Sequence, residues 1–261
     1  MLMRLTAARQ SLTTLATLLL GGVLVPAGLF IPVQAHAVEY KIYSPLVVQG
    51  ETEVELRSFY SSDNLPALDG EQGYRLAVGH AFTDYWASEV YAVLGAGPGQ
   101  SVDAQGVEWE NRFQLTPQGK YWLDSGLMTE LSLPTQSDEP SELALIPLFE
   151  KQFGRVLTTL NPFLEWQFGS SAASGTTLGY RGRVEYLLHP FFSPALEFHG
   201  EPGMIGKFEP TADQRHQVGP AFYGVERFGG RRAFLYSAAV LFGLTRGSPD
   251  TTLTTRLEYE F

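Results

Sequence analysis

The chain contains no cysteine, so disulfide bridges, thiolate nucleophiles and thiolate metal ligands are excluded. Basic residues are also few, because 18 Lys and Arg stand against 28 Asp and Glu and give a formal net charge of −10. An acidic chain without a basic run does not have the character of a nucleic-acid-binding protein. Beyond the amino-terminal region, no apolar run is long enough for a transmembrane helix. If such a chain enters a membrane, it must cross as a closed barrel of strands.

The amino-terminal 37 residues have the pattern of a secretory signal. Arg4 and Arg9 form a basic start, a long apolar core follows, and Ala35, His36 and Ala37 have the small-x-small form of a cleavage site. We therefore expect residues 1–37 to be a cleaved signal peptide and residues 38–261 to form the exported domain. Without Arg4 and Arg9 that domain has 16 basic and 28 acidic residues, a charge of −12. The length of the apolar core leaves an uncleaved membrane anchor as the alternative.

Apolar and polar residues alternate with a period of two along the exported domain, and no stretch has convincing helical periodicity. At the carboxyl terminus, for example, Leu253, Leu257 and Phe261 share one face, whereas Arg256 and Glu258 share the other. Segments of about ten residues with this pattern are typical of transmembrane β-barrels. Counting them predicts an all-β, closed antiparallel transmembrane barrel of about twelve strands.

The connections between these segments alternate between long and short. Outer-membrane barrels have short periplasmic turns and longer extracellular loops, so the alternation predicts that both ends of the barrel domain lie on the periplasmic side. The short connections also predict strand register. A turn at residues 116–120 would place Arg112 opposite Asp124, and a turn at residues 189–191 would place Arg183 opposite Glu197.

The chain ends on a recognisable tail. Leu257, Tyr259 and the terminal Phe261 resemble the carboxyl-terminal signal of bacterial outer-membrane proteins, which implies recognition by the barrel-assembly machinery. The stretches YSPLVVQGETEVELRSFY, GHAFTDYWASEVYAVLG, YWLDSGLMTELSLP and FEKQFGRVLTTLNPFLEW resemble a family of outer-membrane proteins found near operons for the meta-cleavage route of phenol degradation. The resemblance implies a barrel in the outer membrane of a Gram-negative bacterium, in contact with its lipid and with a possible role in transport. It implies no catalytic residues.

The polar faces of the predicted strands should line the lumen. The predicted lumen-lining residues are Glu53, Glu55, Arg57, Arg75, Glu108, Glu110, Arg112, Asp124, Glu130, Glu165, Arg181, Arg183, Glu185, Glu197, Glu226, Arg256 and Glu258. Their carboxylates outnumber their guanidinium groups, which favours a narrow, cation-leaning channel for passive uptake or binding of small solutes. The alternative is a non-conducting structural or assembly barrel in which the same charges only hold the walls together.

A lipid-modifying enzyme is a third alternative. The predicted turn at residues 83–85 places His80 opposite Ser88, which could form a hydrolase pair, but no carboxylate on that face would orient the histidine. His199 and His216 flank the longest predicted loop and could bind a metal, although their spacing matches no specific ligand pattern. We therefore predict no catalytic residues, no cofactor and no metal site.

Overall fold

The computed structural model describes residues 40–261, so the predicted signal peptide at residues 1–37 lies outside the described part of the chain. No helix among the described residues is long and apolar enough to cross a membrane. The strands are β1 (Thr52–Ser62), β2 (Gln72–Ala81), β3 (Trp86–Ala96), β4 (Asp103–Gln114), β5 (Asp124–Pro134), β6 (Ser141–Phe153), β7 (Val156–Phe168), β8 (Thr177–Tyr186), β9 (Ser193–Met204), β10 (Lys207–Phe208), β11 (Arg215–Gly229), β12 (Arg232–Gly243) and β13 (Thr251–Glu260).

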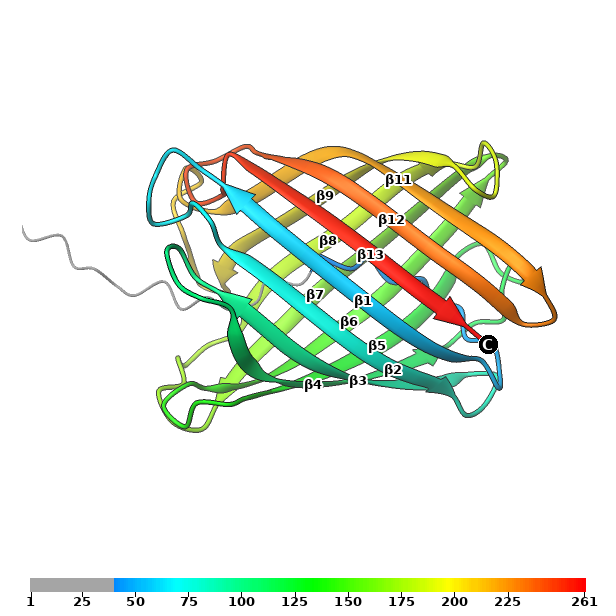
Figure 1. The fold of residues 1–261 in the computed structure, drawn as a ribbon, viewed down its shortest axis with the longest axis horizontal. Helices are drawn as coiled ribbons and strands as arrows, with labels where there is room; N and C mark the ends of the chain where they lie inside the picture. Colours follow the sequence, from blue (N-terminus) through cyan, green and yellow to red (C-terminus); the bar gives the residue numbers. More distant parts are fainter. Residues whose placement is uncertain (1–39) are drawn as a thin grey trace, which may run out of the picture. The chain divides into compact units, whose positions relative to one another are not determined.

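Twelve long strands form a closed barrel in which each strand is antiparallel to both neighbours (Figure 1). The barrel closes where β13 pairs with β1, and the two-residue β10 pairs only with β9. Closure extends to the last residue, because Phe261 N donates to Thr52 O at 2.8 Å and Thr52 N donates to Phe261 O at 3.1 Å. The predicted closed antiparallel barrel is confirmed, and its terminal strand has no free edge.

The connections define two ends of the barrel. The end that carries the carboxyl terminus has short connections such as residues 154–155 and 230–231, and we call it the turn end; the opposite end is the loop end. The predicted pairing of Arg183 with Glu197 is confirmed. The predicted pairing of Arg112 with Asp124 is wrong, because the β4–β5 connection spans residues 115–123 and places Arg112 opposite Met128. The chain turns later than predicted, because Leu115 N and Thr116 N both donate to Ser125 O, and this later turn shifts the register of β5 against β4.

Two prolines interrupt the ladder between β6 and β7. In the described pairing, the register stops after Leu145 and resumes at Phe149. Pro147 lies in that interval, and the same register brings Pro162 of β7 opposite it. Because proline has no N–H to donate, neither residue can contribute a donor to the ladder at this point.

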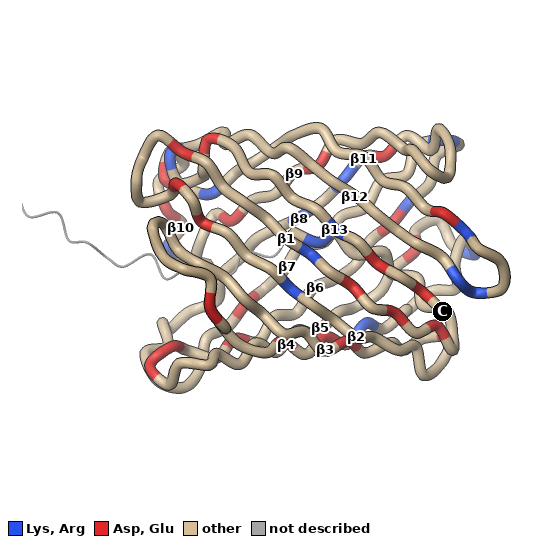
Figure 2. The backbone as a smooth tube through the Cα atoms, viewed as in Figure 1, with Lys and Arg blue, Asp and Glu red and all other residues tan. Residues whose placement is uncertain are grey.

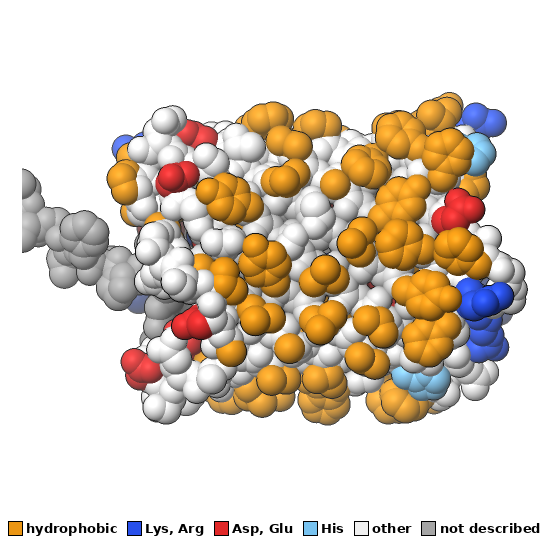
Figure 3. Space-filling view, viewed as in Figure 1, with side chains coloured by type: hydrophobic (Ala, Val, Ile, Leu, Met, Phe, Trp, Pro, Cys, Tyr) orange, Lys and Arg blue, Asp and Glu red, His pale blue; other side chains and the backbone are white. Residues whose placement is uncertain are grey.

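The two faces of the barrel wall differ in polarity. Hydrophobic side chains cover the wall seen in Figure 3, and charged side chains gather at its two ends. Val78 is 61% exposed and Trp109 is 48% exposed, whereas the inward Glu55 is fully buried. An apolar outer band around a polar interior is the inverse of a soluble protein and is typical of transmembrane barrels. The closed barrel and its apolar wall place the chain in an outer membrane.

The interior is filled in part by the chain that precedes β1. Residues 40–51, which we call the lumen segment, contact side chains from strands on all sides of the barrel and therefore lie within it. Tyr43 packs in a buried cluster with Met128, Ile146, Leu148 and Phe163, which gives the barrel its main hydrophobic core. Gly126 allows a close approach there, because a Cβ at that position would lie 2.9 Å from Pro45 Cβ.

Candidate functional site: the occupied lumen

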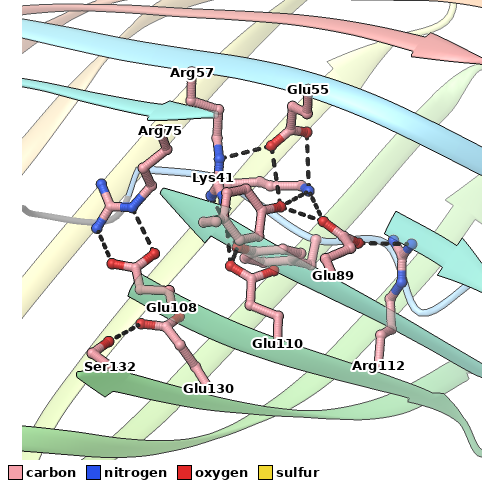
Figure 4. Close-up of polar contacts among 12 residues, drawn as sticks. Lys41, Glu55, Arg57, Arg75, Glu89, Glu108, Glu110, Arg112, Glu130 and Ser132 are labelled. Atoms are coloured by element: carbon pink, nitrogen blue, oxygen red, sulfur yellow. Dashed lines mark hydrogen bonds and ion pairs between the residues drawn. The ribbon is translucent and has the colours of Figure 1, made fainter. Parts of the chain in front are cut away.

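The polar face of the barrel converges on Lys41 of the lumen segment. Lys41 Nζ lies 3.0 Å from Glu55 Oε2 and 3.2 Å from Glu89 Oε2, and it donates to the Tyr91 hydroxyl at 3.1 Å (Figure 4). The Lys41 and Glu55 side chains are almost completely buried. A charge in such a position is retained only when it is paired. The ammonium of the lumen segment therefore links β1 to β3 across the interior.

A second basic side chain extends this network. Arg57 Nε lies 2.7 Å from Glu55 Oε1, and Arg57 Nη2 lies 3.2 Å from Glu110 Oε1. The Tyr43 hydroxyl donates to the same Glu110 oxygen at 2.6 Å and accepts from Arg57 Nη1 at 3.0 Å. Arg256 Nε, from β13, lies 2.5 Å from Glu55 Oε2. The resulting network joins the lumen segment to β1, β4 and β13, and charged positions on these strands are visible along the tube in Figure 2.

An amide on β7 holds the backbone of the lumen segment. Asn161 is fully buried; its Oδ1 accepts from Tyr43 N at 2.7 Å, and its Nδ2 donates to Tyr43 O at 3.0 Å. One side chain thus satisfies both polar groups of a peptide residue, as a neighbouring β-strand would. We call this arrangement the Asn161 clamp.

The rest of the segment is tied down toward the turn end. Ser44 Oγ donates to Glu150 Oε1 at 3.1 Å, and Val47 N donates to Gln114 Oε1 at 2.8 Å. At the turn end Gly50 N donates to Ala81 O at 2.8 Å. The lumen segment is therefore held to the barrel wall at several points, and it narrows the interior along much of the barrel.

A cavity of about 260 Å³ lies between Tyr40 and the loop end, and we call it the vestibule. Its lining is unequal in charge. Among the described residues, seven glutamates line it but only three arginines, and these are Glu71, Glu108, Glu130, Glu139, Glu142, Glu165 and Glu201 against Arg75, Arg181 and Arg215. The Arg75 guanidinium holds Glu108 through two contacts of 2.8 Å. The vestibule is thus a polar chamber with an acidic lining.

Most of the predicted lumen-lining residues lie on inward-facing positions. Those that are buried are Glu53, Glu55, Arg57, Arg75, Glu108, Glu110, Arg181, Arg183, Glu185, Glu197 and Glu258. Those that are half-buried are Arg112, Asp124, Glu130, Glu165 and Arg256.

Glu226 differs from the prediction. It is exposed, and it shares the outward face of β11 with Phe222, because the inward Tyr223 donates to Glu197 from the opposite face. Near the turn end the outer surface of the barrel is also polar, so a polar residue of a strand there does not have to face the lumen.

Sequence reasoning missed Lys41, Tyr43 and Asn161. The first two precede the first strand, where the alternation that identifies inward residues is absent. Asn161 lies on β7, but nothing in its strand pattern distinguishes it from an ordinary inward polar residue. The short run YKIYSP, rich in aromatic residues and placed between the predicted signal and β1, is the one sequence feature that could have drawn attention to an ordered segment.

The geometry does not assemble the enzyme alternatives. His80 Nδ1 lies 2.8 Å from Thr52 Oγ1, while Ser88 Oγ donates to Glu110 O at 3.1 Å and accepts from Trp109 Nε1 at 2.8 Å. The histidine and the serine therefore bond to other groups instead of forming a nucleophile–base pair.

The predicted metal alternative is also not assembled. His199 of β9 points into the barrel, whereas His216 of β11 lies on the outward face of its strand and contacts Tyr180. A different acidic group occurs at the turn end, where carboxylate oxygens of Glu51, Glu53 and Glu260 lie within 4.8 Å of one another. Burial raises the pKa of Glu51, and Arg112 opposes this effect. A raised pKa means that this carboxyl group holds its proton to higher pH than an exposed glutamate does.

Comparisons with known proteins support the fold. No protein-family model matches the sequence, and no curated protein matches it. Among solved structures, the barrel is similar to the COG4313 outer membrane channel from Pseudomonas putida F1, with a TM-score of 0.59 and 14% identity over 85% of this chain and 100% of that chain. A weaker match is OprD from Pseudomonas aeruginosa, with a TM-score of 0.26 and 10% identity over 85% of this chain and 98% of that one. The similarity to the COG4313 channel shows that the barrel has the fold of an outer membrane channel.

Proposed function

We propose that this outer-membrane barrel mediates passive passage of small solutes, with a preference for cations, through a lumen narrowed by residues 40–51. One observation carries the proposal: among residues 40–261, ten glutamates are buried but only five lysines and arginines. Ionised side chains within a membrane-spanning structure need partners or water. The excess of carboxylates gives the interior a negative potential, which raises the local concentration of cations and lowers that of anions.

The orientation and assembly of the barrel belong to the same proposal. Short connections at the turn end match periplasmic turns, so the vestibule would open toward the cell exterior. Leu257, Tyr259 and Phe261 would present the tail that the barrel-assembly machinery reads. The genomic setting that the sequence resemblance implies, close to phenol meta-cleavage operons, can be checked by reading the genes beside this one.

The proposal is tested by recording ion selectivity in a planar lipid bilayer. Glu150 is the residue to change, because it is buried and accepts hydrogen bonds from the hydroxyls of Ser44 and Thr159. Glu150→Gln removes the charge and keeps the shape; its amide oxygen can accept from one of the two hydroxyls, and its NH2 can donate to the oxygen of the other. The matched control is Glu226→Gln, which removes an equal charge from the outward face. We expect small cation-selective steps from the unmodified protein, lower selectivity in Glu150→Gln, and no change in Glu226→Gln. Anion selectivity of the unmodified protein would overturn the proposal.

A non-conducting structural barrel is the second candidate, and the bonding of the lumen segment favours it. Lys41, Tyr43 and Val47 are all buried and bound to the wall, so the narrowest part of the lumen has little free space. Absence of conductance from the unmodified protein, combined with conductance from a Tyr43→Ala variant, would show that the lumen segment closes the barrel at rest.

A further inference from the structure

Arg181 on β8 is a buried cation without a counter-ion. It is 6% exposed, and its guanidinium carbon lies 4.8 Å from the centroid of the Phe163 ring. Its Nη1 has no hydrogen-bond partner, and among the described residues it has no ion pair, although it lines the vestibule. Buried guanidinium groups are normally paired with carboxylate or phosphate, so this side chain carries an unused donor in the wall of the cavity.

His199 lies beside Arg181 and presents the opposite kind of group. The two residues are paired in register on β9 and β8, and His199 is 7% exposed. His199 Nε2 lies 3.1 Å from Glu197 Oε2. A carboxylate only accepts, so Nε2 carries the hydrogen, and in the neutral ring Nδ1 is then an acceptor. Nδ1 has no partner.

The lining of the vestibule supplies the remaining chemistry. Paired residues on neighbouring strands have Cβ atoms about 5 Å apart, so the Arg181 and His199 side chains are close enough together to bind adjacent groups of one small molecule. Carboxyl groups line the arc of wall formed by β4 to β7, which disfavours a ligand whose only charge is negative. The side chains of Val93 and Phe163 add apolar surface.

We propose that the vestibule binds a zwitterionic α-amino acid with an aliphatic side chain. Its carboxylate accepts from Arg181, and its ammonium donates to His199 Nδ1 and faces the acidic arc. The aliphatic part contacts the apolar side chains. This inference goes beyond passage of solutes, because binding at the vestibule requires no open path past the lumen segment.

Isothermal titration calorimetry of the detergent-purified barrel tests the proposal. The probes are L-leucine, isocaproate, which lacks the ammonium, and isoamylamine, which lacks the carboxylate. We expect leucine to bind and both analogues to bind more weakly. Arg181→Gln should weaken leucine binding about tenfold or more, the range for loss of a hydrogen bond to a charged group. Arg181→Lys, which keeps the charge but loses the planar fork, should give an intermediate affinity.

The control is Arg155→Gln, which neutralises an exposed arginine in the β6–β7 turn and should bind leucine as the unmodified protein does. Folding of each variant is checked by its gel migration before and after boiling. Because Arg181 forms no ion pair among the described residues, its neutralisation strands no buried partner charge, and we expect the variants to fold. Absence of leucine binding, equal binding of isoamylamine, or unchanged binding in Arg181→Gln would each overturn the proposal. Calorimetry measures binding without requiring conductance. A barrel that does not conduct but binds leucine would contradict only the proposed passage of solutes, and a barrel that conducts but does not bind leucine would contradict only the binding proposal.

Discussion

The Asn161 clamp predicts how firmly the lumen segment is held. Asn161→Ala removes two hydrogen bonds, of 2.7 Å and 3.0 Å, between a fully buried amide and the Tyr43 backbone. A typical intramolecular hydrogen bond contributes about 1 kcal/mol net, so the variant should favour release of the segment by about 2 kcal/mol, or about 30-fold in the equilibrium. Release of a local element shows as exposure of groups that are otherwise protected.

Thiol labelling measures that exposure. The chain has no cysteine, so Ser44→Cys introduces a unique thiol in the lumen segment with little change in shape. In this background, Asn161→Ala should raise the rate of modification by a water-soluble maleimide about 30-fold, provided that opening precedes labelling. The control is Thr159→Val, two residues away on the same inward face, where the hydroxyl contacts Glu150 and not the Tyr43 backbone. Equal labelling rates in Asn161→Ala and its parent would refute the clamp.

Three further outcomes follow from the barrel itself. The mature protein should fractionate with outer membranes and migrate differently on a gel before and after boiling, whereas recovery as a detergent-free soluble monomer would contradict the fold. Deleting Phe261 should lower outer-membrane levels far more than deleting the loop residue Ser171, because it removes the last pair of hydrogen bonds to β1 as well as the tail. Arg183→Ala should lower the free energy of unfolding by about 3–5 kcal/mol, the cost of leaving a buried charge unpaired. Arg183 Nε lies 3.4 Å from Glu185 Oε2, and Arg183 is paired in register with Glu197. An unchanged denaturant midpoint would mean that other groups satisfy these carboxylates.

The sequence by itself determined the class of fold. Alternation with a period of two is a local property, since it depends only on which face of the strand each side chain takes. It can therefore be recognised without knowing which strands pair with one another. It predicted a closed antiparallel barrel of about twelve strands and an apolar outer wall, and the structure confirms both. Tight turns fixed register where they are short, as for Arg183 and Glu197.

Tertiary structure decided what occupies the lumen. The β4–β5 register places Arg112 opposite Met128 and not Asp124, and the ion-pair partner of Arg112 is Glu89 of the neighbouring strand β3, at 3.5 Å. The contact of Tyr43 with Asn161 joins residues 118 positions apart, and no periodic pattern reports such a pair. The unpaired donor of Arg181 is likewise invisible in a sequence rich in glutamate, where a partner is easy to assume. Local patterns determine which face a residue takes, whereas closure of the barrel determines which residues meet across its interior.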